Sequence, residues 1–144
     1  MAYLTPDDLT AQIPAAQLVE LADDDGDGVA DAAVLAAAIA AAEATLDGYL
    51  QTRYPLPLAT VPPVLVRLAR DLAAWELWSR RDTPDLEKRP VYFRWKDALR
   101  FLEKLASGEV QLGATPPPAE SAGGVRVAQT AAERVFTRDS LRGY

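Results

Sequence analysis

"DAAVLAAAIAAAEATLDGYLQTRY", residues 31–54, is the stretch that decides the fold, because it holds the clearest helical pattern in the chain. Its larger residues recur at steps of four and three, which is the spacing of one face of an amphipathic helix. The stripe consists of Leu35, Ile39, Ala42, Leu46 and Tyr49. The alanines favour helix and let a neighbouring helix approach closely. The YPLPL that follows ends the pattern, since a proline disfavours helix in the residue before it.

Two further stretches carry the same pattern. In 61–81, VPPVLVRLARDLAAWELWSRR, apolar residues step by three and four after an opening pair of prolines. In 83–108 the pattern begins at Thr83, is interrupted or kinked at Pro90, and ends at Gly108 as a C-terminal cap. Two short helices are predicted before these, and Thr5 is expected to cap the first.

The predicted fold class is therefore all-α: a small bundle of three long helices plus short N-terminal helices, with an extended C-terminal arm. The three long helices are expected to meet around one set of buried side chains. That set is Leu46, Leu68, Leu72, Trp75, Leu99 and Leu102.

Composition divides the chain into three parts. We predict a helical domain over residues 1–113, a Pro/Gly-rich linker over 114–123 and an extended arm over 124–144. The arm has weak alternation in "VRV" and "RVF", and too few large apolar residues for a core of its own. We expect it to be mobile in the isolated subunit and to order against a partner, with strand content confined to it.

Charge and missing residue types narrow the function classes. Residues 1–50 carry ten acids and no Lys or Arg, whereas the rest is mildly basic. Such asymmetry suits head-to-tail assembly of identical subunits or a charge match within one chain. The chain has no Cys and no His, which removes thiolate metal sites and the commonest general base. We therefore expect no enzyme and no cofactor. The alanine-rich apolar run is short and flanked by acids, so we expect no membrane contact.

The acidic stretch DDDGDGVAD, residues 23–31, has the layout of a calcium loop. The candidate metal ligands are Asp23, Asp25, Asp27 and Asp31. The twelfth position needs a bidentate acid but holds Val34. The alternative is a tight turn between helices, with glycines supplying positive φ and Asp31 capping the long helix. The sequence thus allows two interpretations of the loop: a weak calcium site, or a turn with a structural role alone.

Aromatic and basic residues each allow two interpretations. Six aromatic side chains at helical spacing either fill the core or form a ligand pocket, and a tryptophan among them is a candidate for a subunit interface. They are Trp75, Trp78, Tyr92, Phe93, Trp95 and Phe101. The basic clusters, such as Arg80–Arg81, are interpreted as solvated faces or partners of the acidic half. Binding of nucleic-acid phosphate is the second interpretation.

The chain resembles a known family at several ordered stretches. These are the opening YLTPDDL, then AEATLDGYLQTRYPLPLATVPPVLVRLARDLAAWELWSRR, RWKDALRFLEKLASGEVQLG and the ending RVFTRDSLRGY. In this order they are similar to the small head-to-tail adaptor, or head-completion, proteins of Mu-like tailed phages and prophages. The resemblance covers nearly the whole chain. Pro90 departs from it, in a stretch that relatives usually keep helical.

The resemblance implies a structural protein of the virion neck, assembled in the host bacterial cytoplasm and without enzymatic activity. It implies a ring of twelve subunits beneath the portal protein, extending the DNA channel and presenting a surface to the next neck or tail-terminator protein. The packaged DNA would pass close by without specific contact. From its residues, the arm is expected to bind partners through charge and one aromatic anchor. Its candidates are Arg126, Arg134, Phe136, Arg138, Leu141, Arg142 and Tyr144.

A rival from another class is a small calcium-binding helical module for protein interaction. A ring that depends on the portal supports the adaptor, whereas a monomer sensitive to chelator supports the calcium module.

Overall fold

A computed structural model describes residues 2–113, and in this part of the chain the regular structure is helical, with no strand. The elements in chain order are α1 (Pro6–Thr10), α2 (Ala15–Ala22), α3 (Ala32–Leu50), α4 (Pro63–Ser79), the 3₁₀ turn η1 (Leu86–Lys88) and α5 (Pro90–Ser107). The all-α prediction of three long helices plus short N-terminal ones is confirmed. The predicted linker and arm lie outside the described residues.

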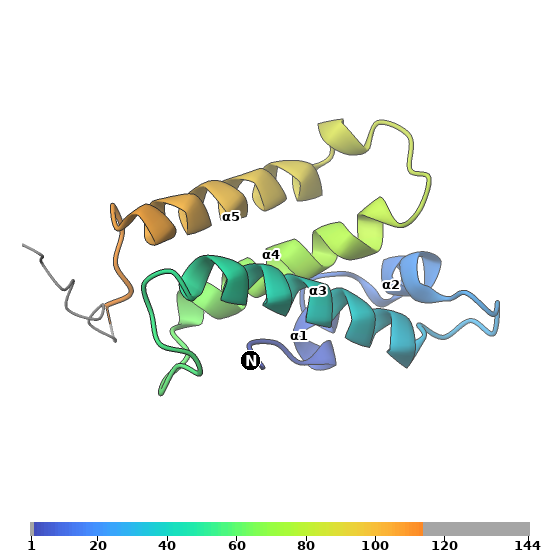
Figure 1. The fold of residues 1–144 in the computed structure, drawn as a ribbon. Helices are drawn as coiled ribbons and strands as arrows, with labels where there is room; N and C mark the ends of the chain where they lie inside the picture. The colour runs from blue at the N-terminus through green and yellow to red at the C-terminus, as the bar shows by residue number, and fades with distance from the viewer. Residues whose placement is uncertain (1, 114–144) are drawn as a thin grey trace, which may run out of the picture.

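The three long helices all contact one another, and α4 makes the most extensive contacts with the other two (Figure 1). It packs against both α3 and α5, while α1 and α2 also lie against it. The acidic loop between α2 and α3 is at one end of the bundle, and the α3–α4 connection is at the other.

The core of the described domain is apolar throughout, with no buried polar or charged residue. Four of the six predicted core positions are buried, namely Leu46, Leu68, Leu72 and Leu102. Trp75 and Leu99 are only half-buried, so that part of the prediction is wrong. Helix α4 packs against helices on two sides, so the buried part of its surface is wider than one stripe. In its second half this surface includes Ala73, Ala74 and Leu77, and Trp75 is only partly covered.

The helix ends follow local sequence. Thr5 donates its backbone N–H to Asp8 Oδ2 at 2.9 Å, which fixes the start of α1. The last long helix begins at Pro90, rather than at Thr83 with an interruption, because proline is well suited to the first helical position. Gly108 ends that helix at φ 82°, as predicted for a C-terminal cap.

Helix α3 is long and apolar enough, by length and composition alone, to cross a membrane. The expectation that the apolar run is too short therefore does not hold for the helix as a whole. Core helices of globular domains have the same composition, and α3 buries its Leu35–Leu50 stripe against α4 and α5. The absence of membrane contact remains a prediction.

Candidate functional site

The acidic loop is a tight turn closed by its own aspartates. Asp23 accepts the backbone N–H of Gly26 on one carboxylate oxygen, at 2.6 Å, and that of Gly28 on the other, at 2.9 Å. Both glycines have positive φ, 79° and 84°, which other residues adopt only at a cost. The backbone bonds from Gly28 and then Gly26 hold the pKa of Asp23 below its usual value. The tight turn predicted from the sequence is therefore present.

Three of the four candidate metal ligands come together. Carboxylate oxygens of Asp23, Asp25 and Asp27 lie within 4.8 Å of one another, with Asp23 half-buried and the other two exposed. Asp31 is not in this group, because its Oδ2 accepts the backbone N–H of Asp24 at 2.9 Å. The same bond corrects a second expectation: Asp31 stands at the N-cap position of α3, but its side chain does not cap the helix. These residues fit a calcium loop only in part, since Val34 offers no oxygen at the twelfth position.

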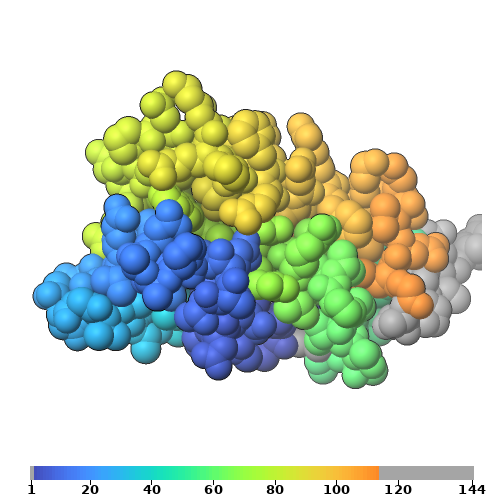
Figure 2. All heavy atoms as spheres, turned by 180° about the vertical axis from the view of Figure 1, so that it is seen from behind, coloured from blue at the N-terminus to red at the C-terminus, as the bar shows by residue number. Residues whose placement is uncertain are grey.

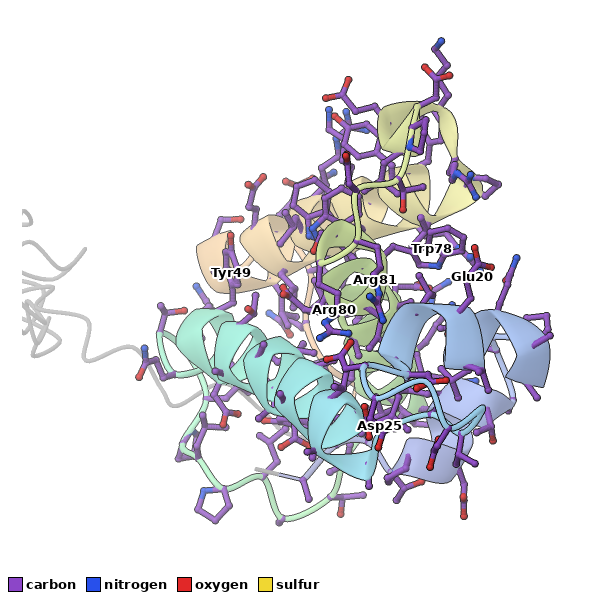
Figure 3. The ribbon with its side chains drawn as sticks, turned by 90° about the vertical axis from the view of Figure 1, so that its right-hand side faces the viewer. Glu20, Asp25, Tyr49, Trp78, Arg80 and Arg81 are labelled. Carbon is purple, nitrogen blue, oxygen red and sulfur yellow. The ribbon has the colours of Figure 1, made fainter. Side chains whose placement is uncertain are left out.

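Two arginines at the end of α4 hold the acidic loop in place (Figure 3). Arg80 binds Asp24 with both terminal nitrogens, at 3.1 and 2.6 Å, and donates to the Leu21 carbonyl at 2.9 Å. Such a bidentate pair fixes orientation as well as distance. The Arg80 bond also holds the pKa of Asp24 below its usual value. The predicted match between basic residues and the acidic half is present at this point.

Arg81 completes the anchor through backbone carbonyls. Its Nε donates to the Leu21 carbonyl at 3.2 Å, and its Nη2 donates to the Asp23 carbonyl at 2.7 Å and to Asp24 Oδ1 at 2.9 Å. The last carbonyls of a helix have no partner within the helix, and here the arginines supply partners for α2. No sequence pattern indicates these carbonyl contacts, because they depend on where α4 ends relative to α2.

The N-terminal segment is fixed to α3 by Tyr3. Its backbone N–H donates to Glu43 Oε1 at 2.6 Å, and its hydroxyl donates to Asp47 Oδ1 at 2.5 Å. Burial, followed by the bond to Asp47, raises the pKa of the Tyr3 hydroxyl. The segment ahead of α1 is thus part of the folded domain, a contact that the sequence analysis missed.

Aromatic side chains of α4 and α5 form a cluster that is partly exposed to solvent. Trp75 stacks on Trp95, with ring centroids 4.5 Å apart and planes 16° from parallel, and Tyr92 lies against both. Phe93, 55% exposed, packs edge-on against Tyr92. The interpretation of these rings as core filling is therefore wrong for Phe93 and incomplete for the others, which are half-buried. A role for a tryptophan at a subunit interface stays a prediction.

The described domain ends beside the α3–α4 connection. Leu112 is buried and donates its backbone N–H to the hydroxyl of Tyr54 at 3.1 Å. The candidate partner-binding residues of the arm lie outside the described residues. They are Arg126, Arg134, Phe136, Arg138, Leu141, Arg142 and Tyr144. The described part of the chain therefore ends on the side of the bundle opposite to the acidic loop (Figure 1).

Comparison with known proteins identifies the family. The model of the family described as "Bacteriophage Mu, Gp36" matches residues 3–129, which is most of the chain and includes the whole described bundle from Tyr3. The chain belongs to this family. The match continues past Gly113 over the predicted linker and into the first residues of the predicted arm.

Two curated relatives are similar to this member of the Mu Gp36 family. "Gene product J" of Escherichia phage Mu is 32% identical over 140 residues, covering 96% of each chain. "Mu-like prophage FluMu protein gp36" of Haemophilus influenzae is 41% identical over 83 residues, which are 58% of this chain and 55% of the relative. The family membership indicates a structural or morphogenesis protein of a Mu-like phage.

Proposed function

We propose that the chain is a structural head-to-tail adaptor that forms a ring under the portal protein and links the head to the neck and tail. The observation that carries this proposal is membership of a Mu phage family along nearly the whole chain, residues 3–129. The fold supports it, because a small bundle with an apolar core suits a rigid ring subunit. The absence of His and Cys from the sequence supports a role without catalysis.

The proposed mechanism is geometric. Each subunit contributes its bundle to a ring, proposed to have twelve members, and the ring continues the DNA channel below the portal. The acidic half of the chain, residues 1–50, either faces DNA that must slide without phosphate contacts or meets a basic neighbour. The opposite surface would receive the next neck or tail-terminator protein. Assembly would occur in the host cytoplasm, and the mature location would be the virion neck.

The arm, residues 124–144, is proposed to attach the ring to the portal. It carries four arginines for an acidic partner surface, and Phe136 is its largest apolar anchor. Deletion of this segment should leave the bundle folded, because the core of the described residues closes around α3, α4 and α5. The same deletion should abolish portal binding, and particles made with it should lose DNA or fail to join tails.

The test is a portal pull-down with the full chain, the deletion and two point variants, all checked for helicity by circular dichroism. Phe136→Ala should weaken binding about tenfold or more, as expected for a hot-spot residue. Gln129→Ala, in the same segment, is the matched control and should bind as wild type. A folded deletion that keeps full affinity would refute the proposed role of the arm.

The calcium-binding module remains a second candidate, because three aspartates of the acidic loop converge. Light scattering with and without chelator separates it from the adaptor. The adaptor predicts a mass that chelator leaves unchanged and a complex that forms with portal. The calcium module predicts a monomer whose stability or binding falls when chelator is added.

A further inference from the structure

A cleft lies where the connection between α1 and α2 meets α4 and α5, on the face that Figure 2 presents, and three arginines are part of its lining. Its volume is about 610 Å³. Its lining includes Arg67, Arg70, Asp71, Arg94, Asp97 and Phe101. We call this hollow the arginine cleft. It shares none of its lining with the Arg80–Arg81 anchor or with the aromatic cluster.

Arg67 and Arg94 of the cleft lack acidic partners among the described residues, whereas the positive charge of Arg70 acts on the Asp8 carboxylate. No salt bridge joins Arg67, Arg70 or Arg94 to a carboxylate within residues 2–113. The cleft's two carboxylates are engaged by other groups: Asp71 accepts Gln12 Nε2 at 3.0 Å, and Asp97 pairs with Arg100 at 3.5 Å. The Nε of Arg70 is buried without a hydrogen-bond partner, which is costly unless a further group satisfies it.

The acidic loop has the complementary features. Asp25 and Asp27 are exposed and form no salt bridge with an arginine of residues 2–113. Val29, which lies between them and α3 in the sequence, has 63% of its surface exposed. The loop's own arginines, Arg80 and Arg81, fix it at the end of the bundle. It therefore lies at one end of the bundle as an acidic tip with one apolar residue (Figure 1), whereas the cleft has three arginines against two aspartates and Phe101 in its wall.

We propose that the acidic loop of one copy of this chain docks in the arginine cleft of the next copy. This inference rests on the proposed ring, for which it supplies the subunit contact. The two surfaces are different, so the contact is head-to-tail, and such contacts close into rings when the rotation between copies allows. Opposite charges on the two surfaces also select this register over loop-to-loop or cleft-to-cleft pairing.

A peptide loop suits the cleft better than nucleic-acid phosphate does. Asp71 and Asp97 lie in the same lining as the arginines, and a continuous phosphate backbone would be brought against both. A loop can instead place discrete carboxylates opposite Arg67 and Arg94 and set Val29 against Phe101. Burying the apolar tip in the same step shields the charge pairs from water.

Cysteine cross-linking tests the contact directly, because the chain has no native cysteine. Full-length Val29→Cys is mixed with full-length Asp97→Cys at high protein concentration under mild oxidation. The matched control partner is Glu103→Cys, which replaces another exposed acid on α5 outside the cleft. We expect the Asp97→Cys mixture to form heterodimer about tenfold faster, the lower end of the gain from electrostatic steering. The excess should vanish near 1 M salt, where the screening length is about 3 Å.

Charge reversal provides the second readout. Arg67→Glu with Arg94→Glu, carried on the Asp97→Cys chain, should remove the excess, whereas Lys104→Glu at an exposed site on α5 outside the cleft should keep it. Asp25→Lys with Asp27→Lys on the partner should restore cross-linking to the reversed cleft. Equal rates for the cleft and control cysteines, or no restoration, would overturn the loop–cleft contact. Portal binding by the wild-type chain is measured in parallel: if it persists, only this contact fails, and if it is absent, the proposed function fails.

Discussion

Truncation of Leu72 at the centre of the bundle should cost more than any other change considered. The side chain is 3% exposed and belongs to α4, which packs against both α3 and α5. Leu72→Ala removes three buried carbon groups, worth about 2.4 kcal/mol of transfer free energy at about 0.8 kcal/mol each. The cavity left behind should bring the loss to about 3–5 kcal/mol. A domain of this size has a total stability on the order of 5–15 kcal/mol, so a large fraction is lost.

Urea unfolding of the full-length chain, followed by tryptophan fluorescence and circular dichroism, measures this loss. Leu99→Ala is the matched control, because Leu99 is half-buried although its sequence pattern predicts a core position. We expect it to cost about 1–2 kcal/mol, in proportion to the smaller apolar area that it removes from water. Similar losses for the two variants, or a loss below about 1 kcal/mol for Leu72→Ala, would refute the helix faces described.

Four further predictions concern the acidic loop and the N-terminal segment. Arg81→Ala should lower the free energy of unfolding by about 1–2 kcal/mol through lost charged hydrogen bonds, whereas the exposed Arg100→Ala should change it little; an equal effect would contradict the anchor. The pKa of Asp24 is lowered in the fold, so the stabilisation by its carboxylate should fade as pH falls below about 4. In thermal melts, the melting temperature of Asp24→Asn should therefore fall less than that of wild type on acidification. Because the pKa of Tyr3 is raised, stability should fall above about pH 10, where the unfolded chain ionises and the fold does not, and Tyr3→Phe should reduce that alkaline loss. Calcium should bind at roughly millimolar strength or weaker, and Val34→Glu should tighten it at least about tenfold in calorimetric titration; micromolar binding by wild type would contradict the incomplete ligand set.

Helical periodicity was sufficient to predict α3, α4 and α5, because each has a stripe of apolar residues long enough to define one face. Periodicity did not predict the partial exposure of Trp75, because a helix that packs against two neighbours buries a surface wider than one stripe. The start of α5 was misplaced for a local reason. A proline inside a periodic stretch indicates a break, and only the structure shows that the preceding turn, Leu86–Lys88, is separate.

The residues of the acidic loop could be predicted from the sequence, but the bonds that join the loop to the rest of the bundle could not. Alternating aspartates and glycines indicated the turn, and Val34 at the twelfth position indicated an incomplete metal loop. The bonds from Arg80 and Arg81 to the carbonyls of α2 join residues about sixty positions apart, which no local pattern can specify. The arginine cleft likewise combines residues from three segments, and only the packed structure brings Arg67, Arg70 and Arg94 together.

An image of the phage neck at side-chain resolution tests the central claim most directly. We expect a closed ring of copies of this chain directly beneath the portal, with residues 124–144 in contact with portal subunits and the DNA path running through the centre. Density for the chain at another position in the particle, or a neck in which the ring below the portal is built from a different protein, would contradict the proposed role.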